Sequence, residues 1–431
     1  MIRLDTSDAG FAADFARIVA DRRESDGDVA GAVSAILADV RARGDAALAD
    51  YTERFDAHPL NGEADWRIDA QACRAAFDAL DPALRRALET AAQRITAYHA
   101  AQKPEDRDYT DAVGVRLGAV WRPVDAAGLY VPGGRAAYPS SLLMNAIPAK
   151  VAGVERLVVV TPTPRGTVNP LVLAAAHLAG VDEIWRVGGA QAIGALAYGT
   201  DRIKPVDVIT GPGNAYVAEA KRQLYGVVGI DMVAGPSEIL VIADAKNDPQ
   251  WIAADLLSQA EHDPVAQSIL ITDDAAFADA VIAAVETELQ ALATQATARA
   301  SWEAFGVVIT VADLAAEAPA LANALAAEHV EVATDDPQAM FAQIRHAGSV
   351  FLGRHTPEAV GDYVAGPNHV LPTGRRARFA SGLSVLDFMK RTSFIQLDAG
   401  ALAAIGPAAV ALADAEGLPA HGRSVAVRLG Q

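Results

Sequence analysis

Short apolar runs alternate with helical stretches along most of the chain, and this alternation limits the possible folds more than any other feature. Two series of such runs are present, one beginning at Gly128 and the other at Ile239. Because parallel strands need long crossover connections, strands separated by helices indicate βαβ units and parallel sheets of about five strands each. The expected strands are residues 128–131, 156–161, 183–187 and 207–210 in the first series, and 239–243, 268–272, 307–311, 330–333 and 350–352 in the second.

The two ends of the chain differ from this middle part. Residues 29–102 show alanine-rich helical patterns with a polar, proline-containing break at residues 56–65. Residues 381–431 are too few for an independent core, so we expect them to pack on another domain or another subunit. The fold class is thus α/β, with two Rossmann-like parallel-sheet domains, a helical N-terminal segment and a small C-terminal tail. We assign residues 24–127 with 239–380 to one sheet domain, 128–238 to the other, and 1–23 with 381–431 to the tail region.

Charge and cysteine content exclude several classes of protein. The 431 residues carry a net charge of −18 with no basic stripe, which argues against nucleic acid or an anionic membrane as a partner. The one cysteine, Cys73, excludes an intrachain disulfide and a cysteine-rich zinc site, and its helical context favours a packing role. The start of the chain lacks a basic segment leading into an apolar one, and no later stretch is apolar for long enough to span a membrane. We therefore expect a cytoplasmic protein that acts on a small ligand.

Gln259 and His262 are three residues apart at the end of an apolar helix and therefore share one of its faces. The helix is expected to open at Asp248 and Pro249, an N-cap residue followed by proline in the first turn. The spacing suits two ligands of one metal ion. Taken alone, it equally suits a histidine that serves as a cation near the negative end of the helix.

The sequence around these two residues resembles the signature of the histidinol dehydrogenase family. The resemblance rests on Ile230–Glu238, the apolar strand that follows, and Asp255–His262. Further blocks resemble the family in the same order along the chain, from about residue 128 to residue 421: Gly128–Gly134, Gly188–Ala192, Gly211–Asn214, Ala327–His329, Ala347–Gly353, Gly361–Tyr363, Asn368–Thr373, Ser381–Val385 and Glu416–His421.

The resemblance implies a zinc ion, one per subunit, held by Gln259, His262, Asp362 and His421. Two imidazoles, one carboxylate and one amide suit zinc better than calcium or magnesium. Without the family resemblance, we would interpret Asp362 and His421 as exposed surface residues. The family pattern further implies that His421 reaches the site from the partner subunit, which makes the enzyme a homodimer with shared sites and the tail region its means of dimerisation.

Glu328 and His329 lie where a helix gives way to a strand, a place from which both side chains can turn toward a cleft. Alone they would be an exposed pair at a helix end, but the resemblance makes them the general acid and base, and both chemical groups suit that task. It also places Ser237 and Glu416 on the substrate, together with Gln259, His262, Glu328, Asp362 and His421. Ser237 equally suits a turn cap. The remaining histidines show no such assembly, although His369 lies within a family block.

Ligands of doubly wound sheets gather at the carboxyl ends of strands, and several of these residues fall there. Gly211–Asn214 follows an expected strand, where its glycines could expose amide groups to a phosphate or simply form a turn. The G-x-G-x-x-G fingerprint is absent, because its last position is Tyr216. NAD is therefore implied by the resemblance alone, with contacts at Tyr130, Gln191 and Asn214 in the 128–238 domain, and the 239–380 domain carries the metal and the catalysis.

The implied reaction is the oxidation of L-histidinol to L-histidine through bound L-histidinal, with two NAD and one water. Two other readings are a dehydrogenase of another small polar alcohol, of the sulfopropanediol type, and a zinc-stabilised binding protein without activity. Intact Glu328 and His329 favour an enzyme, and Ser237 and Glu416 favour the imidazole substrate. Arg135 and Pro367 stand where the family more often has threonine, which leaves their substrate contacts open.

Overall fold

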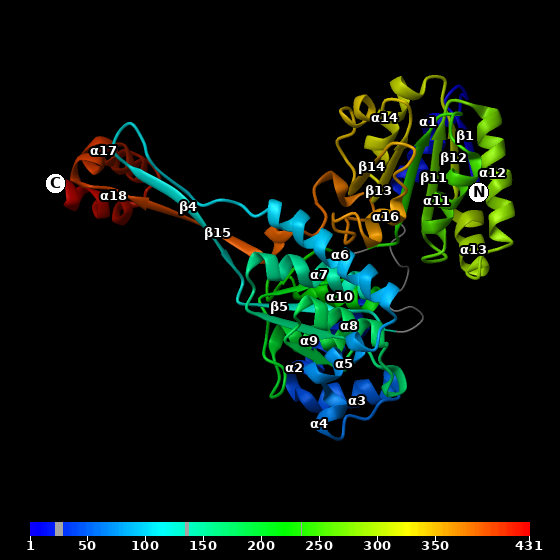
Figure 1. Cartoon of the computed structure of the whole chain (residues 1–431). Helices are drawn as coiled ribbons and strands as arrows, with labels where there is room; N and C mark the ends of the chain where they lie inside the picture. The colour runs from blue at the N-terminus through cyan, green and yellow to red at the C-terminus, as the bar shows by residue number, and fades with distance from the viewer. Residues whose placement is uncertain (22–28, 134–137, 234) are drawn as a thin grey trace.

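The computed structural model describes residues 1–21, 29–133, 138–233 and 235–431, and two six-stranded sheets form its centre (Figure 1). The first sheet has the order β2-β7-β6-β5-β8-β9, and only β2 runs antiparallel to its neighbour. Its strands are β2 (Arg67–Ile68), β5 (Ala126–Tyr130), β6 (Arg156–Val160), β7 (Glu183–Trp185), β8 (Val208–Thr210) and β9 (Gly229–Ile230).

Helices cover both faces of the first sheet. One face packs against α5 (Ala70–Asp78), α6 (Pro82–Ala101), α7 (Pro139–Ala152) and α8 (Pro170–Ala179). The other packs against α2 (Ala30–Arg43), α3 (Asp45–Asp56), α9 (Gly189–Tyr198) and α10 (Ala215–Leu224), while the short α4 (Glu63–Trp66) precedes β2. Cys73 is buried in the first of these two cores, in agreement with a packing role. The expected break in the N-terminal helices lies between α3 and α4.

The second sheet has the order β1-β12-β11-β10-β13-β14, with every pair of neighbours parallel. All six residues of β10 and of β11 are buried, which explains why these central strands appear in the sequence as unbroken apolar runs. The strands are β1 (Ile2–Asp5), β10 (Glu238–Ala243), β11 (Gln267–Thr272), β12 (Val307–Thr310), β13 (His329–Ala333) and β14 (Ser349–Leu352). One face packs on α1 (Phe11–Ala20), α14 (Leu314–Leu325) and α15 (Pro337–Phe341), and the other on α11 (Pro249–Ala260), α12 (Ala275–Leu289) and α13 (Gln295–Phe305).

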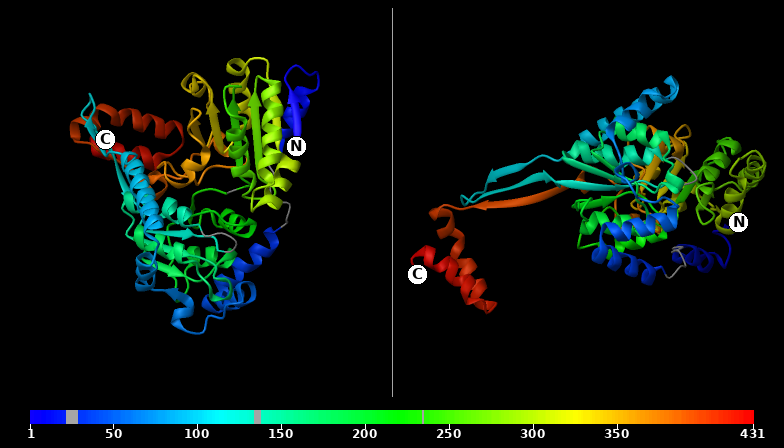
Figure 2. Two further views of the ribbon diagram at one scale, coloured as in Figure 1. Left: turned by 45° about the vertical axis from the view of Figure 1, so that its right-hand side comes forward. Right: turned by 90° about the horizontal axis from the view of Figure 1, so that it is seen from below.

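A third, antiparallel sheet forms an arm that projects from the two sheet layers and ends in two helices (Figures 1 and 2). It consists of β3 (Arg107–Thr110), β4 (Arg116–Pro123) and β15 (Met389–Gln396), in the order β15-β4-β3. The helices at its end are α17 (Ala399–Ala415) and α18 (Pro419–Ala426). Most residues of β3, β4 and β15 are exposed or half-buried, so this sheet has almost no core of its own.

The fold class expected from the sequence is confirmed, but two segments pack elsewhere than we expected. Strand β1 pairs with β12 of the second sheet, so residues 2–5 do not join the tail. The helices between residues 30 and 101 cover the first sheet and not the second. Both segments bury their apolar sides against a sheet that lies far away in the sequence, which no local pattern can indicate. Among the described residues, no helix combines the length and apolar character that a membrane crossing requires.

Candidate active site

Glu328 and His329 lie at the amino edge of the second sheet, where β13 begins beside the start of β10. The His329 Nδ1 atom is 3.0 Å from the carbonyl oxygen of Glu238, and the N–H of Glu238 donates to a Glu328 carboxylate oxygen at 3.0 Å. A carbonyl oxygen only accepts, so Nδ1 carries the ring proton and Nε2 carries the lone pair. The backbone N–H of Glu238 thus holds the Glu328 side chain, and its carbonyl oxygen holds the His329 ring.

Both side chains have strongly shifted pKa values because they are buried. Burial lowers the pKa of His329 to about 4, against the opposing hydrogen bond to Glu238, so the ring is neutral at neutral pH. Burial also raises the pKa of Glu328 well above its usual range, while the N–H of Glu238 opposes this shift. Nearby negative charges on Glu238, Asp362 and Glu358 raise the Glu328 pKa further. Shifts of this size at one place are typical of catalytic groups.

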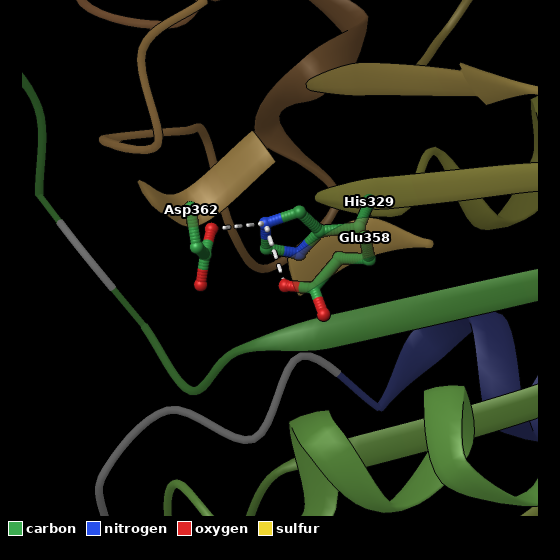
Figure 3. A group of neighbouring side chains, drawn as sticks. All are labelled: His329, Glu358 and Asp362. Atoms are coloured by element: carbon green, nitrogen blue, oxygen red, sulfur yellow. Dashed lines mark ion pairs between the residues drawn. The ribbon is translucent and has the colours of Figure 1, made fainter. Parts of the chain in front are cut away.

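The Nε2 atom of His329 faces two carboxylates, as Figure 3 shows. It lies 3.6 Å from Glu358 Oε1 and 3.9 Å from Asp362 Oδ1. Both carboxylates come from α16 (Glu358–Tyr363), which follows the edge strand β14. One ligand atom from each of His329, Glu358 and Asp362 lies within 4.8 Å of the others, so the group could hold a metal ion.

Asp362, which we expected as a metal ligand together with Gln259, His262 and His421, lies in this group beside His329 and Glu358. Burial, together with the negative charge of Glu358, raises its pKa to about 8. The pKa of Glu358 is raised as well, again mainly by burial. A divalent cation would favour the ionised form of both carboxyl groups, which is the physical condition for metal binding.

Gln259 lies in the last turn of α11 and His262 just beyond the end of that helix. Gln259 is fully buried, and neither its Oε1 nor its Nε2 has a hydrogen-bond partner among the described residues. A buried amide in this state costs free energy unless a ligand satisfies it. The next residue, Ser258, donates its hydroxyl to Glu358 at 2.9 Å, which ties this end of α11 to α16.

His262 is exposed, and its charge acts on the same group of side chains. It lowers the pKa values of Glu358, His329 and His369, in each case as a smaller effect than burial. The end of α11 therefore places a candidate amide ligand and a candidate imidazole ligand beside the carboxylates of α16.

Glu416 and His421 are not near this group in a single chain. Glu416 caps the end of α17 and His421 lies in α18, both exposed at the far end of the arm (Figures 1 and 2). Ser237 directly precedes Glu238 and is half-buried, with its carbonyl oxygen accepting from the N–H of Gln267 at 3.0 Å. Its contact with substrate stays a prediction.

A pocket of about 350 Å³ opens beside His329. His329, Asp362 and His369 line it together with Tyr98 of α6, Ser349 and Pro367. Pro367, one of the two departures from the family pattern, is thus placed at the pocket wall, whereas Arg135 lies outside the described residues. The pocket joins residues from the second sheet with a helix that covers the first.

Sequence reasoning missed several titratable residues of this site. His369 Nδ1 lies 3.0 Å from the carbonyl oxygen of Asp362, and burial lowers its pKa to about 4. Behind His329, burial raises the pKa of Glu331 to about 9 and that of Asp255 to about 6. A signal was available for Glu331, because a carboxylate in the apolar run 330–333 is unusual in a buried parallel strand. For Glu358 the sequence offers no comparable signal.

The three residues assigned to NAD lie at the carboxyl edge of the first sheet. Tyr130 ends β5, and its hydroxyl accepts from the N–H of Gly189 at 3.1 Å. Gln191 is buried in the first turn of α9. Asn214 caps α10, with its side-chain oxygen accepting from the N–H groups of Tyr216 and Val217. Strands β5 and β8 are neighbours from which the connections lead in opposite directions, which is the usual ligand position of a doubly wound sheet.

The turn after β8 approaches Tyr130 very closely. Gly211 has φ +109°, and a Cβ atom there would lie 2.2 Å from the carbonyl oxygen of Tyr130. The buried carboxylate of Asp231 accepts from the N–H of Gly211 at 2.8 Å, and Lys221 donates to the Gly211 carbonyl oxygen at 3.0 Å. Lys221 and Asp231 also form a buried ion pair with each other. The backbone at this turn is therefore fixed by two charges, and glycine is required there.

A family model, sequence relatives and a solved structure all match this chain to histidinol dehydrogenases. A family model described as histidinol dehydrogenase matches residues 19–429. The chain is 62% identical over 431 residues to the histidinol dehydrogenase of Zymomonas mobilis, with all of both chains covered, and 63% identical over 430 residues to that of Rhodospirillum rubrum, with 100% and 99% covered. The crystal structure of histidinol dehydrogenase from Elizabethkingia anophelis matches with a TM-score of 0.94 at 35% identity, covering 100% of this chain and 98% of that one.

Proposed function

The chain belongs to the histidinol dehydrogenase family, and we propose that it oxidises L-histidinol to L-histidine through bound L-histidinal. This is the last step of histidine biosynthesis. The alcohol loses a hydride and a proton to give the aldehyde, which adds one water and loses a second hydride and a second proton to give the acid. Two NAD accept the two hydrides. The observation that supports the proposal best is the buried His329, whose Nε2 lone pair faces the carboxylates of α16.

His329 would take the hydroxyl proton at Nε2 in each oxidation. A neutral imidazole is needed for this step, and the lowered pKa keeps the ring neutral. Glu328 would activate the water that adds to the aldehyde. Because its pKa is raised, its ionised form is a stronger base toward water than an exposed carboxylate. Both side chains are buried, which limits the loss of the aldehyde to solvent.

Gln259, His262 and Asp362 would hold zinc, together with His421 of the partner subunit. The amide of Gln259, which has no protein partner among the described residues, and the raised pKa of Asp362 both suit a bound cation. When bound, zinc supplies a Lewis acid that binds the imidazole and amino groups of the substrate. Ser237 and Glu416 of the partner subunit would contact the substrate as well, the latter through its ammonium group.

Tyr130, Gln191 and Asn214 would contact NAD at the carboxyl edge of the first sheet. The close packing of Gly211 against Tyr130 fixes the turn that leads to Asn214 at this edge, where a cofactor phosphate or ribose would lie. When bound, NAD supplies the hydride acceptor. Because the reaction depends on NAD, we also propose the cytoplasm as its location.

The most direct test is an assay of purified protein with NAD and L-histidinol, with and without a chelator. We expect two NADH per histidinol, and loss of activity with retained fold when elemental analysis shows that zinc is gone. Sulfopropanediol serves as the control substrate. Faster turnover of sulfopropanediol than of histidinol, or unchanged histidinol turnover by zinc-free protein, would refute the proposal.

A homodimer with shared sites explains how His421 can serve as a ligand although it lies at the end of the arm. Leu412 and Leu418, both exposed on that end, give the second copy apolar surface to cover. Mixing His421→Ala with His262→Ala under conditions of subunit exchange should restore activity, because one of the two sites in the mixed dimer then carries neither defect. If exchange is demonstrated and no activity returns, His421 does not act across subunits.

A further inference from the structure

Glu238 connects the two catalytic side chains through its own peptide groups. Its N–H donates to Glu328 and its carbonyl oxygen accepts from His329 Nδ1, both at 3.0 Å. Any rotation of this part of the backbone at the start of β10 would therefore move Glu328 and change the orientation of the His329 ring. The positions of Glu328 and His329 therefore depend on how well the backbone of Glu238 is fixed.

The side chain of Glu238 is held by Arg375. The Arg375 Nη1 atom lies 3.0 Å from Glu238 Oε1, and the two side chains are each 1% exposed. The second nitrogen, Nη2, donates to Gln267 Oε1 at 2.9 Å and to the carbonyl oxygen of Ile18 at 3.2 Å. One guanidinium group thus joins the start of β10 to the start of β11 and to helix α1.

The backbone of Arg375 adopts a conformation that arginine rarely takes. Its φ is +67°, in the left-handed region, and it follows Gly374 with φ +60°. Such a conformation persists only where the surroundings fix it, and it is often found at functional sites. The hydroxyl of Thr373, two residues earlier, accepts from the N–H of Gly235 at 2.5 Å. The loop 373–375 thus contacts the start of β10 at Glu238 and the segment before β10 at Gly235.

We propose that Arg375 is a positioning residue of the reaction: through Glu238 it holds Glu328 and His329 in the arrangement that proton transfer requires. The proposal rests on the proposed function for its catalytic consequence. Arg375 itself lies behind Glu238 and is not among the residues that line the pocket. Its loss should therefore reduce turnover more than substrate affinity, because the candidate zinc ligands Gln259 and His262 and the residues assigned to NAD lie on other elements.

Three variants test this role. Arg375→Met removes the cation, Arg375→Lys keeps the charge but loses the forked geometry, and Glu238→Gln/Arg375→Met removes both charges. We expect kcat to fall about 100-fold in Arg375→Met and about 10-fold in Arg375→Lys, with both KM values within about 3-fold, because small misplacements of catalytic groups are costly. Arg378→Met is the matched control, since Arg378 is exposed in the short helical turn that follows this loop and bonds only the carbonyl oxygen of Ala324 among the described residues.

Nitrogen NMR of the histidine rings provides a readout that does not depend on turnover. In the wild-type protein the His329 signal, assigned by its absence in His329→Gln, should report a proton on Nδ1 and none on Nε2. The Arg375 variants should show a mixture of tautomers or a shifted Nδ1 signal. A purely structural role would lower the fraction of folded protein but leave the kcat of the folded fraction and this tautomer unchanged.

The outcomes separate this proposal from the proposed function. If wild-type protein does not oxidise histidinol, the function is wrong, while the ring signal still shows whether Arg375 orders His329. If Arg375→Met fails to fold, the kcat values and ring signals of Arg375→Lys and of Glu238→Gln/Arg375→Met test the positioning role instead. Wild-type kcat and wild-type ring signals in a folded Arg375 variant would overturn the positioning role, as would an equal loss of kcat in Arg378→Met.

Discussion

The two parallel sheets carry their candidate functional residues at opposite edges and with opposite chemistry. At the carboxyl edge of the first sheet the assigned residues follow the strand ends, and backbone turns such as Gly211 predominate. At the amino edge of the second sheet the candidate groups are titratable side chains, with Glu328 and His329 buried and Asp362 half-buried. In the function that we propose, similar layers of strands and helices would support binding at one edge and proton transfer at the other.

The difference follows from where each sheet places its charges. In the first sheet the buried ion pair of Lys221 and Asp231 is used to fix the backbone of a turn. In the second sheet the ion pair of Arg375 and Glu238 likewise fixes the backbone at the start of β10. Here, however, further carboxylates such as that of Glu358 lie close to His329. Changes at the first edge should therefore affect NAD binding, and changes at the second edge should affect chemistry.

A large effect is expected from Glu328→Gln, which keeps the shape of the side chain and removes its basicity. Oxidation of histidinal should slow by about 10²- to 10³-fold, because hydration of the aldehyde needs a base. Oxidation of histidinol should slow less. Supplying histidinal directly isolates the second stage. Equal losses in the two stages would assign Glu328 a structural role instead.

A smaller effect, and one confined to NAD, is expected from Lys221→Met. Asp231 would keep a buried charge without its cation, which costs about 3–5 kcal/mol of the free energy of unfolding. The loosened Gly211 turn should raise the KM for NAD about 10-fold while kcat stays within about 3-fold. Lys204→Met, at an exposed lysine near the same sheet, is the control. A fall in kcat with unchanged KM would contradict the division between the two edges.

The smallest effect is expected from Tyr130→Phe, which removes the hydroxyl that accepts from the N–H of Gly189. Loss of one such hydrogen bond costs about 1 kcal/mol, which corresponds to about a 5-fold weaker affinity for NAD. Titration calorimetry measures it directly, with the exposed Tyr225→Phe as control. An unchanged affinity would show that Tyr130 supports the turn without contributing to binding.

The sequence predicted those parts of the fold that local patterns determine. The buried strands of both sheets appear as apolar runs, and helix α11 begins at Asp248 and Pro249 as its capping residues indicate. The sequence did not predict the arm, because β15 is mostly exposed and its residues show no apolar face. It also did not predict that β1 joins the second sheet, since its partner β12 lies about three hundred residues away.

The candidate site was predicted only where its residues fall in recognisable blocks. Asp362 and Glu328 both lie beside His329. Gln259 and His262 lie at and just beyond the end of α11. Glu358 and Arg375 were missed, because their roles depend on contacts with residues that are distant in the sequence. The contact between Arg375 and Glu238 forms only because the folded chain brings the loop 373–375 to the start of β10.

The division between a binding edge and a chemical edge can be tested most directly in a single variant, His329→Gln, by measuring NAD affinity and single-turnover oxidation of histidinol side by side. His177→Gln, at an exposed histidine on α8, is the matched control. Loss of a general base costs about 10²- to 10⁴-fold in rate, so we expect hydride transfer to slow in that range while NAD affinity stays within about 2-fold of wild type. A variant that retains the wild-type rate, or one that loses NAD affinity in proportion to its rate, would contradict this division.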